Sequence, residues 1–320
     1  MRSNQVKIRY SWWANDTTIQ KSFFRDLFNS AGYSVKEVCE PNAKCDFEII
    51  GVNKPKKDTL LDGINRIVKS NKIVGQDNSF AYPHSYHPRT KGAKNKIWVT
   101  LENVRPPAQK DFFVTLSYDQ FDFDQSNYYL PAWYMMIGLF GAVHVEIEGI
   151  GSQNEIERAH FMNLLAARKL TNYSEKSFAF SIFGNPHPVR LKAIDSLNKI
   201  SKVDVFGRVT GKRVESKFNI GEKYKFGICF ENNFYPGYVT EKLLQAYISG
   251  TIPIYWGCLG NDTSINRECF INMSDFETTE EFLDYIRTID EAKYRAIYEK
   301  PFLTQKPDIE KVKSKLISVL

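Results

Sequence analysis

The chain of 320 residues lacks the features that mark several classes of protein. No apolar run approaches the roughly 20 residues of a membrane-spanning helix, and the first ten residues do not resemble a signal peptide. Internal repeats and low-complexity tracts are absent, which excludes a repeat array. We therefore expect a soluble protein located in the cytoplasm, with the inner face of the membrane as a second option.

Cysteine is also scarce, with five residues in the whole chain. They are Cys39, Cys45, Cys229, Cys258 and Cys269. These positions are too few and too scattered for a disulfide framework or a zinc site. Cys39 and Cys45 are near enough in sequence to pair, but ordinary reduced cysteines fit the pattern better.

The net charge of +6 is a small excess of basic residues. It suits an anionic substrate such as a nucleotide sugar, although a solvated surface explains it equally well. No nucleic-acid partner is expected. The length exceeds one ordinary α/β domain, and 42% hydrophobic residues supply sizeable cores. We predict domains at 1–155 and 156–300, followed by a C-terminal helix within 301–320.

The most informative stretch is 225–258. Apolar residues alternate over 226–230, as in a strand, and then repeat at helical spacing over 243–248. Gly250 supplies the stop of that helix, and 251–256 is a second apolar strand. The pattern predicts a β-α-β unit whose ligand site lies at the carboxyl end of its first strand.

The predicted helix begins Thr240-Glu241-Lys242, with Thr240 as the N-cap. An ammonium in the first turn opposes the helix dipole, which favours anions at that end. A bound phosphate would relieve the conflict at Lys242. For Glu241 the dipole alone is an equally good explanation.

Strand and helix patterns also alternate in the first half of the chain, which indicates a parallel sheet covered by helices. A strand is predicted at 97–101, with Glu102 directly at its carboxyl end. A carboxylate in that position is a candidate general base. The alternative is that Glu102 only caps the loop before Pro106 and Pro107.

A second cation, Arg190, stands at the start of another predicted helix, after the turn 185–188. Together with Lys242 it could neutralise a diphosphate, while an ordinary surface role for either residue stays open. The next strand, 203–206, leads to Arg208. A polar helical stretch over 151–172 is expected to cross between the two domains.

Two motifs contain residue types that bind metals, but neither is a strong enough signal to predict a metal site. His84 and His87 share a polar loop, but their spacing is a weak signal. Asp122 and Asp124 have the D-x-D form of metal-dependent sugar transferases, yet they lie among aromatic residues and are interpreted as structural. We predict no metal site.

The run FENNFYPGYVTEKLLQAYISGTIPIYWG closely resembles the donor-binding signature of the α1,3/α1,4-fucosyltransferases, glycosyltransferase family 10. SIFGNPHPVR and VDVFGR resemble further segments of that family, and VTLENVRPP resembles its catalytic segment. The resemblance covers about 95–290 and is strongest over 178–276. It is looser around Glu102, where the register is therefore open.

The resemblance implies a GT-B type architecture, with two Rossmann-like domains facing each other across a cleft. It implies an inverting transfer of L-fucose from GDP-β-L-fucose to the GlcNAc or glucose of lactosamine-type or lactose-type glycans. No cofactor is then required, although non-essential stimulation by a divalent metal is compatible with this expectation. A weak peripheral contact between membrane and the amphipathic helix at 306–320 also stays open.

The resemblance further implies roles for individual residues. Glu102 would act as the general base, and Glu241 would hold ribose hydroxyls or lie near the reacting sugar. The donor-binding candidates are Arg190, Arg208, Asn232, Tyr238, Glu241 and Lys242. Two alternatives remain, a transferase of the same fold with another donor sugar and an inactive glycan-binding relative. The acceptor glycan, the choice of 1,3 or 1,4 linkage and the oligomeric state are left open.

Overall fold

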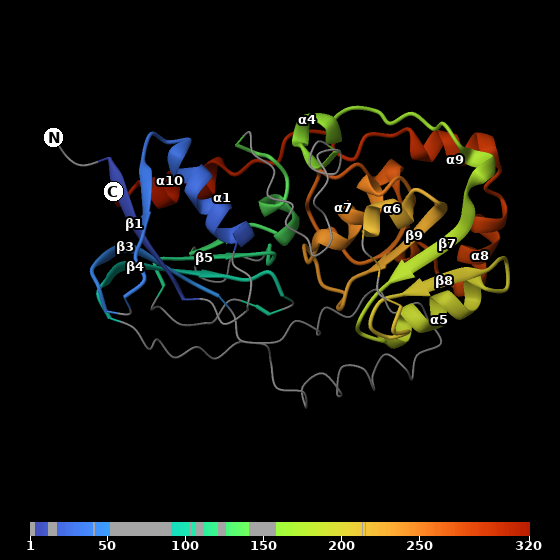
Figure 1. The fold of residues 1–320 in the computed structure, drawn as a ribbon, viewed down its shortest axis with the longest axis horizontal. Coiled ribbons are helices and arrows are strands. Elements are labelled where there is room, and N and C mark those ends of the chain that lie inside the picture. The colour runs from blue at the N-terminus through green and yellow to red at the C-terminus, as the bar shows by residue number, and fades with distance from the viewer. Residues whose placement is uncertain are drawn as a thin grey trace. The chain divides into compact units, whose positions relative to one another are not determined.

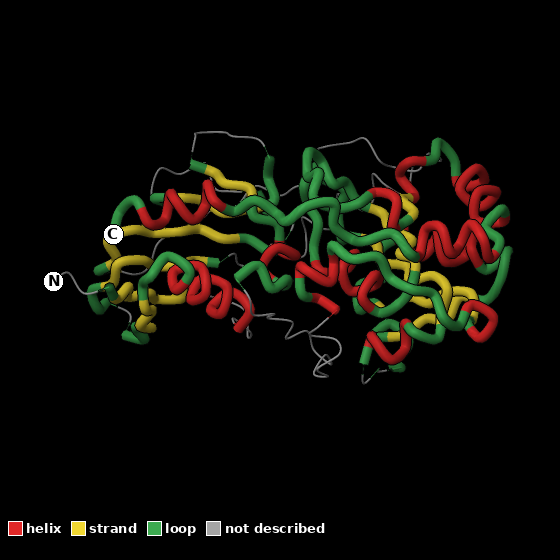
Figure 2. Tube along the Cα trace, turned by 90° about the horizontal axis from the view of Figure 1, so that it is seen from above, coloured by secondary structure: helices red, strands yellow, loops and turns green. Residues whose placement is uncertain are grey.

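The computed structural model describes residues 4–11, 18–40, 42–51, 91–102, 104–105, 112–120, 126–140, 158–212, 214 and 216–320. The chain divides into two compact units. The first unit comprises 1–55, 81–144 and 307–320, and the second comprises 56–80 and 145–306. Strands and helices are mixed in both units, as the α/β class requires (Figures 1 and 2).

The described strands of the first unit form one parallel sheet in the order β2-β1-β3-β4-β5-β6. The strands are β1 (Gln5–Ser11), β2 (Ser34–Glu37), β3 (Cys45–Ile50), β4 (Ala93–Val99), β5 (Val114–Ser117) and β6 (Asn127–Tyr129). The described helices are α1 (Thr18–Asn29), α10 (Glu310–Ile317) and the 3-10 turn η2 (Ala132–Met135). All these strands run parallel, so their carboxyl ends share one edge of the sheet.

Helix α1 carries an apolar stripe along one face. Phe23, Phe24, Leu27 and Phe28 recur at helical spacing, and each is at most 2% exposed. The chain leaves the helix through Gly32, whose φ of +85° is a conformation that favours glycine. The stripe therefore buries one face of α1 in the core of the first unit.

The last helix of the chain returns to the first unit. Val312 and Leu316 of α10 are buried, and α10 packs against α1 (Figure 1). The ammonium of Lys315 lies 4.5 Å from the centre of the Phe113 ring, a cation–π distance. The amphipathic pattern of this helix is thus satisfied by packing within the protein.

The described strands of the second unit form a parallel sheet in the order β11-β10-β9-β7-β8. The strands are β7 (Ser177–Ile182), β8 (Val203–Phe206), β9 (Tyr224–Phe230), β10 (Ile252–Trp256) and β11 (Ile271–Asn272). The helices are α4 (Phe161–Leu164), α5 (Pro188–Leu197), α6 (Lys217–Gly221), α7 (Glu241–Ile248), α8 (Thr279–Arg287) and α9 (Glu291–Tyr298), with 3-10 turns at Tyr173–Glu175, Arg267–Cys269 and Met273–Asp275.

This strand order has a topological switch point between β7 and β9. From β7 the chain moves to one side, towards β8, and from β9 it moves to the other, towards β10 and β11. Ligands of open α/β sheets bind outside the carboxyl ends of the strands at such a point. The fold alone therefore directs attention to the loops that follow β7 and β9.

Helices cover both faces of this second sheet. Helices α6 and α7 pack together, whereas α5 packs against α8, and the strands run between these two pairs (Figure 1). The core is rich in aromatic side chains, and Tyr294 joins it while its hydroxyl donates to the backbone oxygen of Lys225 at 2.8 Å. Gly250, with φ +82°, ends α7 before β10 begins.

The expected α/β fold with two parallel sheets is confirmed. The predicted β-α-β unit is also confirmed, as β9, α7 and β10. Within 158–172 the helical prediction is confirmed for residues 158–159 and for α4, but not for residues 165–172, which are not helical. In this non-helical part the guanidinium of Arg168 donates to the backbone oxygens of Tyr298 and Thr251, which ties the segment to distant parts of the second unit.

All five cysteines are free, so the pairing of Cys39 with Cys45 does not occur. Within the described part of the chain, no helix combines the length and apolar character needed to cross a membrane.

Candidate functional site

Arg190 joins the two loops at the switch point of the second sheet. It lies in the first turn of α5, which begins at Pro188 because proline is favoured at the first helical position. Its guanidinium donates to the backbone oxygen of Asn185 at 2.7 Å and to that of Phe230 at 2.6 Å. Arg190 is 3% exposed, and burial lowers its pKa. The arginine therefore ties the loop after β7 to the end of β9.

Glu231, the residue directly after β9, is the centre of a buried hydrogen-bond network. Its side chain is completely buried and accepts from the backbone N–H and the hydroxyl of Thr240, both at 2.8 Å. The hydroxyl of Tyr255 donates to the same carboxylate at 3.3 Å. A buried carboxylate is stable only when its oxygens are paired in this way.

Lys242 completes this network from the first turn of α7. Its ammonium lies 3.0 Å from Glu231 Oε2, donates to Thr240 Oγ1 at 2.7 Å, and is 3.6 Å from Glu241 Oε1. Burial lowers the pKa of Lys242, but the two carboxylates outweigh burial and raise the pKa above its ordinary value. Lys242 therefore stays charged, and its side chain keeps 24% of its surface exposed.

The network changes the interpretation of two residues. The unfavourable position of Lys242 at the helix N-terminus is already compensated by Glu231, before any phosphate binds. Thr240 stands at the N-cap, as predicted, but its hydroxyl makes no capping hydrogen bond because it is committed to Glu231. Sequence reasoning missed Glu231, although a carboxylate that directly follows an apolar strand is a signal that could have identified it.

Glu241 is half-buried beside Lys242 in the first turn of α7. Burial raises its pKa, but Lys242, a backbone N–H and Lys217 together outweigh burial and lower it. Glu241 is consequently an anion at neutral pH. The helix dipole and the neighbouring ammonium both account for its charge.

Arg208 follows β8, in the turn that Gly207 opens with φ +100°. Its guanidinium lies across Gly184, where a Cβ atom would be only 2.7 Å from Arg208 Nε. Arg208 is exposed, and its side chain has no hydrogen-bond partner among the described residues. A guanidinium with free donors, held beside the loop after β7, is suited to bind an anion.

The loop after β9 carries two further candidates. Asn232 is partly exposed, and its amide has no side-chain partner in the described ranges. Tyr238 differs, because it is 2% exposed and its ring is enclosed by the unit. Asn232 is thus free to bind a ligand, while Tyr238 contributes mainly to the packing of the loop.

His187, which the sequence presented only as part of a turn, is a buried residue of the same region. Its ring centre lies 5.7 Å from that of Trp256, at the end of β10. The side chain is 5% exposed, and Nδ1 has no hydrogen-bond partner in the part of the protein described here. Burial and the charge of Arg190 lower its pKa to about 4, so the imidazole is neutral at pH 7.

Glu102 belongs to the first unit, whereas all the other candidates belong to the second. Strand β4 ends at Val99, two residues earlier than predicted, and the hydroxyl of Thr100 donates to the backbone oxygen of Glu102 at 2.9 Å. The backbone of Glu102 is thereby fixed. Its carboxylate is partly exposed and forms no ion pair or hydrogen bond with any described residue.

The described ranges contain no group of three or more His, Cys, Asp or Glu residues that could hold a metal ion. The two metal motifs of the sequence, His84 with His87 and Asp122 with Asp124, lie outside the described residues.

Residues 174–306 match the family model described as "Glycosyltransferase family 10 (fucosyltransferase) C-term". This range includes Arg190, Arg208, Asn232, Tyr238, Glu241 and Lys242, whereas Glu102 lies outside it.

Two named relatives share part of the sequence. The chain is 30% identical over 234 residues to the alpha-(1,3)-fucosyltransferase FucT of Helicobacter pylori, which covers 65% of this chain and 48% of that protein. It is 29% identical over 110 residues to the human 4-galactosyl-N-acetylglucosaminide 3-alpha-L-fucosyltransferase 9, which covers 33% of this chain and 31% of that protein. The chain thus spans about half or less of the length of these curated relatives.

The fold agrees with solved structures over nearly the whole chain. A crystal structure of an α1,3-fucosyltransferase with GDP-fucose aligns with a TM-score of 0.64 and 22% identity, covering 98% of this chain and 90% of that one. The same comparison with a GDP complex gives a TM-score of 0.65. The expected GT-B type fold is therefore confirmed.

Proposed function

We propose that the chain is a member of glycosyltransferase family 10, whose C-terminal model residues 174–306 match, and that it transfers L-fucose from GDP-β-L-fucose to a glycan hydroxyl. The observation that carries the proposal is that this match includes all six donor-binding candidates. Relatives named as α1,3-fucosyltransferases support the same reaction, and the name of one of them supports a galactosyl-N-acetylglucosaminide acceptor. The proposed acceptor is the GlcNAc or glucose of lactosamine-type or lactose-type glycans.

In the proposed donor complex, the diphosphate of GDP lies at the switch point of the second sheet. Arg208 supplies free guanidinium donors, and Lys242 supplies the ammonium N–H that neither Glu231 nor Thr240 accepts. Arg190 has donors beyond the two that hold the backbone, and Asn232 adds an amide. Glu241 accepts from hydroxyl groups of the ribose or the sugar.

The proposed transfer inverts the configuration of the sugar. The acceptor oxygen attacks the anomeric carbon of fucose, while the bond from that carbon to the phosphate oxygen of GDP breaks. Glu102 takes the proton of the acceptor hydroxyl as the new bond forms. The cations around the diphosphate stabilise the negative charge that develops on the departing GDP. In this mechanism Glu231 keeps Lys242 protonated, which preserves the positive charge that the leaving group needs.

The test is the melting temperature in the presence of GDP, GDP-fucose, GDP-mannose and UDP-galactose, each measured with and without EDTA. A ligand that binds only the folded state raises the melting temperature. We expect stabilisation by GDP and GDP-fucose and no effect of EDTA. Stabilisation by UDP-galactose would contradict the proposed donor, and loss of stabilisation in EDTA would contradict metal-independent binding.

A further inference from the structure

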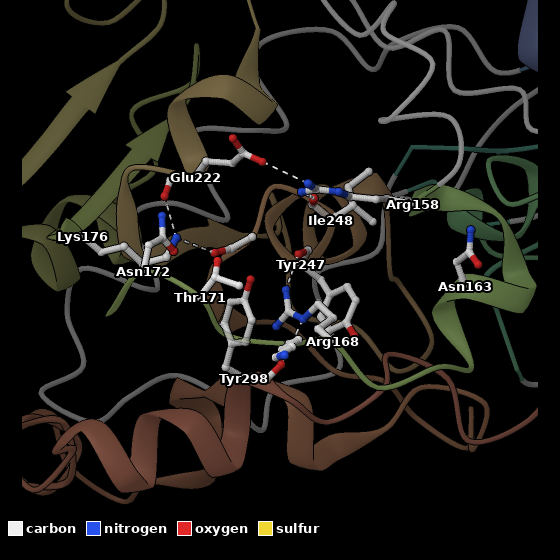
Figure 3. A pocket seen from close by; sticks show the side chains of 12 residues that line it. Arg158, Asn163, Arg168, Thr171, Asn172, Lys176, Glu222, Tyr247, Ile248 and Tyr298 are labelled. Atoms are coloured by element: carbon white, nitrogen blue, oxygen red, sulfur yellow. Dashed lines mark hydrogen bonds and ion pairs between the residues drawn. The ribbon is translucent and has the colours of Figure 1, made fainter. Parts of the chain in front are cut away.

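The second unit contains a cavity of about 510 Å³ at the edge of its sheet opposite the proposed donor site. Lys176 directly precedes β7 and Gly250 precedes β10, so these lining residues mark the amino-terminal edge of the parallel strands. Tyr247, near the end of α7, and Tyr298, at the end of α9, add aromatic faces (Figure 3). The donor candidates, by contrast, follow the carboxyl ends of β7, β8 and β9.

The lining has a large excess of positive charge. It includes the side chains of Arg158, Arg168, Lys169 and Lys176 and one carboxylate, that of Glu222. Arg158 pairs with Glu222 at 3.1 Å. Among the residues that the structure describes, the other three cations have no carboxylate within ion-pair distance.

Arg168 and Lys176 are held in place by neutral acceptors. Arg168 donates to the backbone oxygens of Tyr298 at 3.0 Å and Thr251 at 3.1 Å, and its guanidinium lies 3.6 Å from the centre of the Tyr247 ring. Figure 3 shows this arginine close to both tyrosines. Backbone oxygens satisfy its hydrogen bonds but do not cancel its charge.

Lys176 is arranged in the same way, with 7% of its surface exposed. Its ammonium donates to the backbone oxygens of Glu222 at 2.6 Å and Gly250 at 3.0 Å. Burial lowers its pKa to about 8, and the charges of Arg168 and Arg158 act in the same direction, while the Glu222 carboxylate opposes them only in part. These contacts fix two positive charges beside the cavity before any ligand arrives.

Polar side chains with unused hydrogen-bonding capacity stand at the same cavity. Lys169 and Thr171 are exposed, and Asn172 is partly exposed. The side chains of these three residues have no hydrogen-bond partner within the described ranges. An ammonium, a hydroxyl and an amide are therefore free to bind a ligand.

We propose that this cavity binds a phosphate-bearing small molecule, at a site separate from that for the donor. A phosphate ester carries nearly two negative charges, which suits three unneutralised cations better than a single carboxylate would. The volume is within the range of about 300–1,000 Å³ typical of ligand pockets and exceeds that of one small ion. Hydroxyl groups of the ligand would pair with Thr171 and Asn172. The phosphate belongs either to a free metabolite or to a lipid headgroup.

Inorganic pyrophosphate is the first probe, added to the full chain with the proposed donor site saturated by GDP. We expect pyrophosphate to raise the melting temperature further. The double variant Lys169→Glu and Thr171→Val should weaken this binding at least about tenfold, since it reverses one charge and removes one hydroxyl. Lys192→Glu, the same charge reversal on the exposed face of α5, should leave the binding unchanged.

Sedimentation with vesicles distinguishes the two sources of phosphate. Binding to vesicles of phosphatidic acid, but not to vesicles of phosphatidylcholine, and its loss in the double variant would assign the site to a lipid headgroup. Two outcomes overturn the proposal: neither pyrophosphate nor anionic vesicles bind, or binding is unchanged in the double variant. If GDP fails to stabilise the protein but pyrophosphate still stabilises it in a way that depends on Lys169 and Thr171, only the proposed donor is contradicted.

Discussion

The ammonium of Lys242 lies 3.0 Å from the completely buried carboxylate of Glu231, across the loop that joins β9 to α7. Thr240 contributes to both groups, because its hydroxyl donates to Glu231 and accepts from Lys242. The pair has a structural and an electrostatic role. It holds the loop against the end of the strand, and it keeps a cation charged at the edge of the sheet where the donor is proposed to bind.

Glu231→Gln should lower the free energy of unfolding by about 3 kcal/mol, because breaking a buried pair leaves one charge without its partner. Urea denaturation measures this change. Glu268→Gln is the matched control, since Glu268 forms an exposed pair with Lys300 and its loss should cost less than about 1 kcal/mol. If Glu231→Gln lowers the free energy of unfolding by no more than Glu268→Gln does, the structural role of the pair is refuted.

His187 should make the free energy of unfolding depend on pH at values higher than those at which carboxylates titrate. Its pKa is about 4 in the folded protein and near 6.5 when exposed, so the unfolded chain binds the proton first as the pH falls. The stabilisation is complete above pH 6.5 and is lost progressively towards pH 4, by up to about 1.4 kcal/mol per pH unit.

Urea denaturation at several values between pH 7 and pH 5 measures this loss while Glu241, whose pKa is lowered, remains ionised. His187→Phe keeps a ring against Trp256 and should remove most of the dependence on pH. If the free energy of unfolding depends equally steeply on pH in the wild type and in His187→Phe, another group is responsible for the pH dependence.

Arg190 and Arg208 should differ in their effects on stability. Arg190→Lys removes the two-pronged contact with Asn185 and Phe230 and should cost about 1–3 kcal/mol of unfolding free energy. Arg208→Lys removes no hydrogen bond of its side chain to a described residue and should change stability by less than about 0.5 kcal/mol.

Both variants should weaken GDP binding, measured by calorimetry, if both arginines contact the diphosphate. Arg208→Lys is the more informative of the two, because its folded state should be undisturbed. Wild-type GDP affinity in Arg208→Lys would remove this residue from the proposed donor site.

Glu102→Gln should reduce fucose transfer by at least about 100-fold, because the amide cannot accept the proton of the acceptor hydroxyl. The affinity for GDP-fucose should stay within about twofold of the wild type, since a base contributes to the chemical step rather than to donor binding. Transfer assays with lactose and N-acetyllactosamine measure the first quantity, and calorimetry measures the second.

Glu37→Gln is the matched control for this experiment, because Glu37 is an exposed carboxylate of the same unit that pairs with Lys21. It should retain full transfer activity. Substantial activity in Glu102→Gln would mean that another group is the base.

The sequence predicted the second sheet well because its signals are local. Alternation over 226–230, helical spacing over 243–248 and Gly250 each depend on neighbouring residues, and β9, α7 and β10 appear where they indicate. In the described part of 151–172 the helical prediction holds for 158–159 and α4 but not for 165–172, where Arg168 donates to carbonyl groups about 80 and 130 residues away. Local pattern carries no information about such contacts.

The candidate site shows the same limit. Arg190 and Lys242 were identified as cations at helix starts, and the structure places both there. Their partners were not predicted, since the carboxylate of Glu231 and the backbone oxygen of Phe230 reach them only after the sheet has formed. The functional roles of these residues stay predictions until the variants are measured.

The return of α10 to α1 has a consequence for the order of folding during synthesis. The first unit receives its last helix from residues that the ribosome adds only after the entire second unit has been made. Until then, the surface of α1 that α10 covers is open to solvent or to chaperones. We therefore expect the second unit to reach its native state first on the ribosome, although it comes later in the chain.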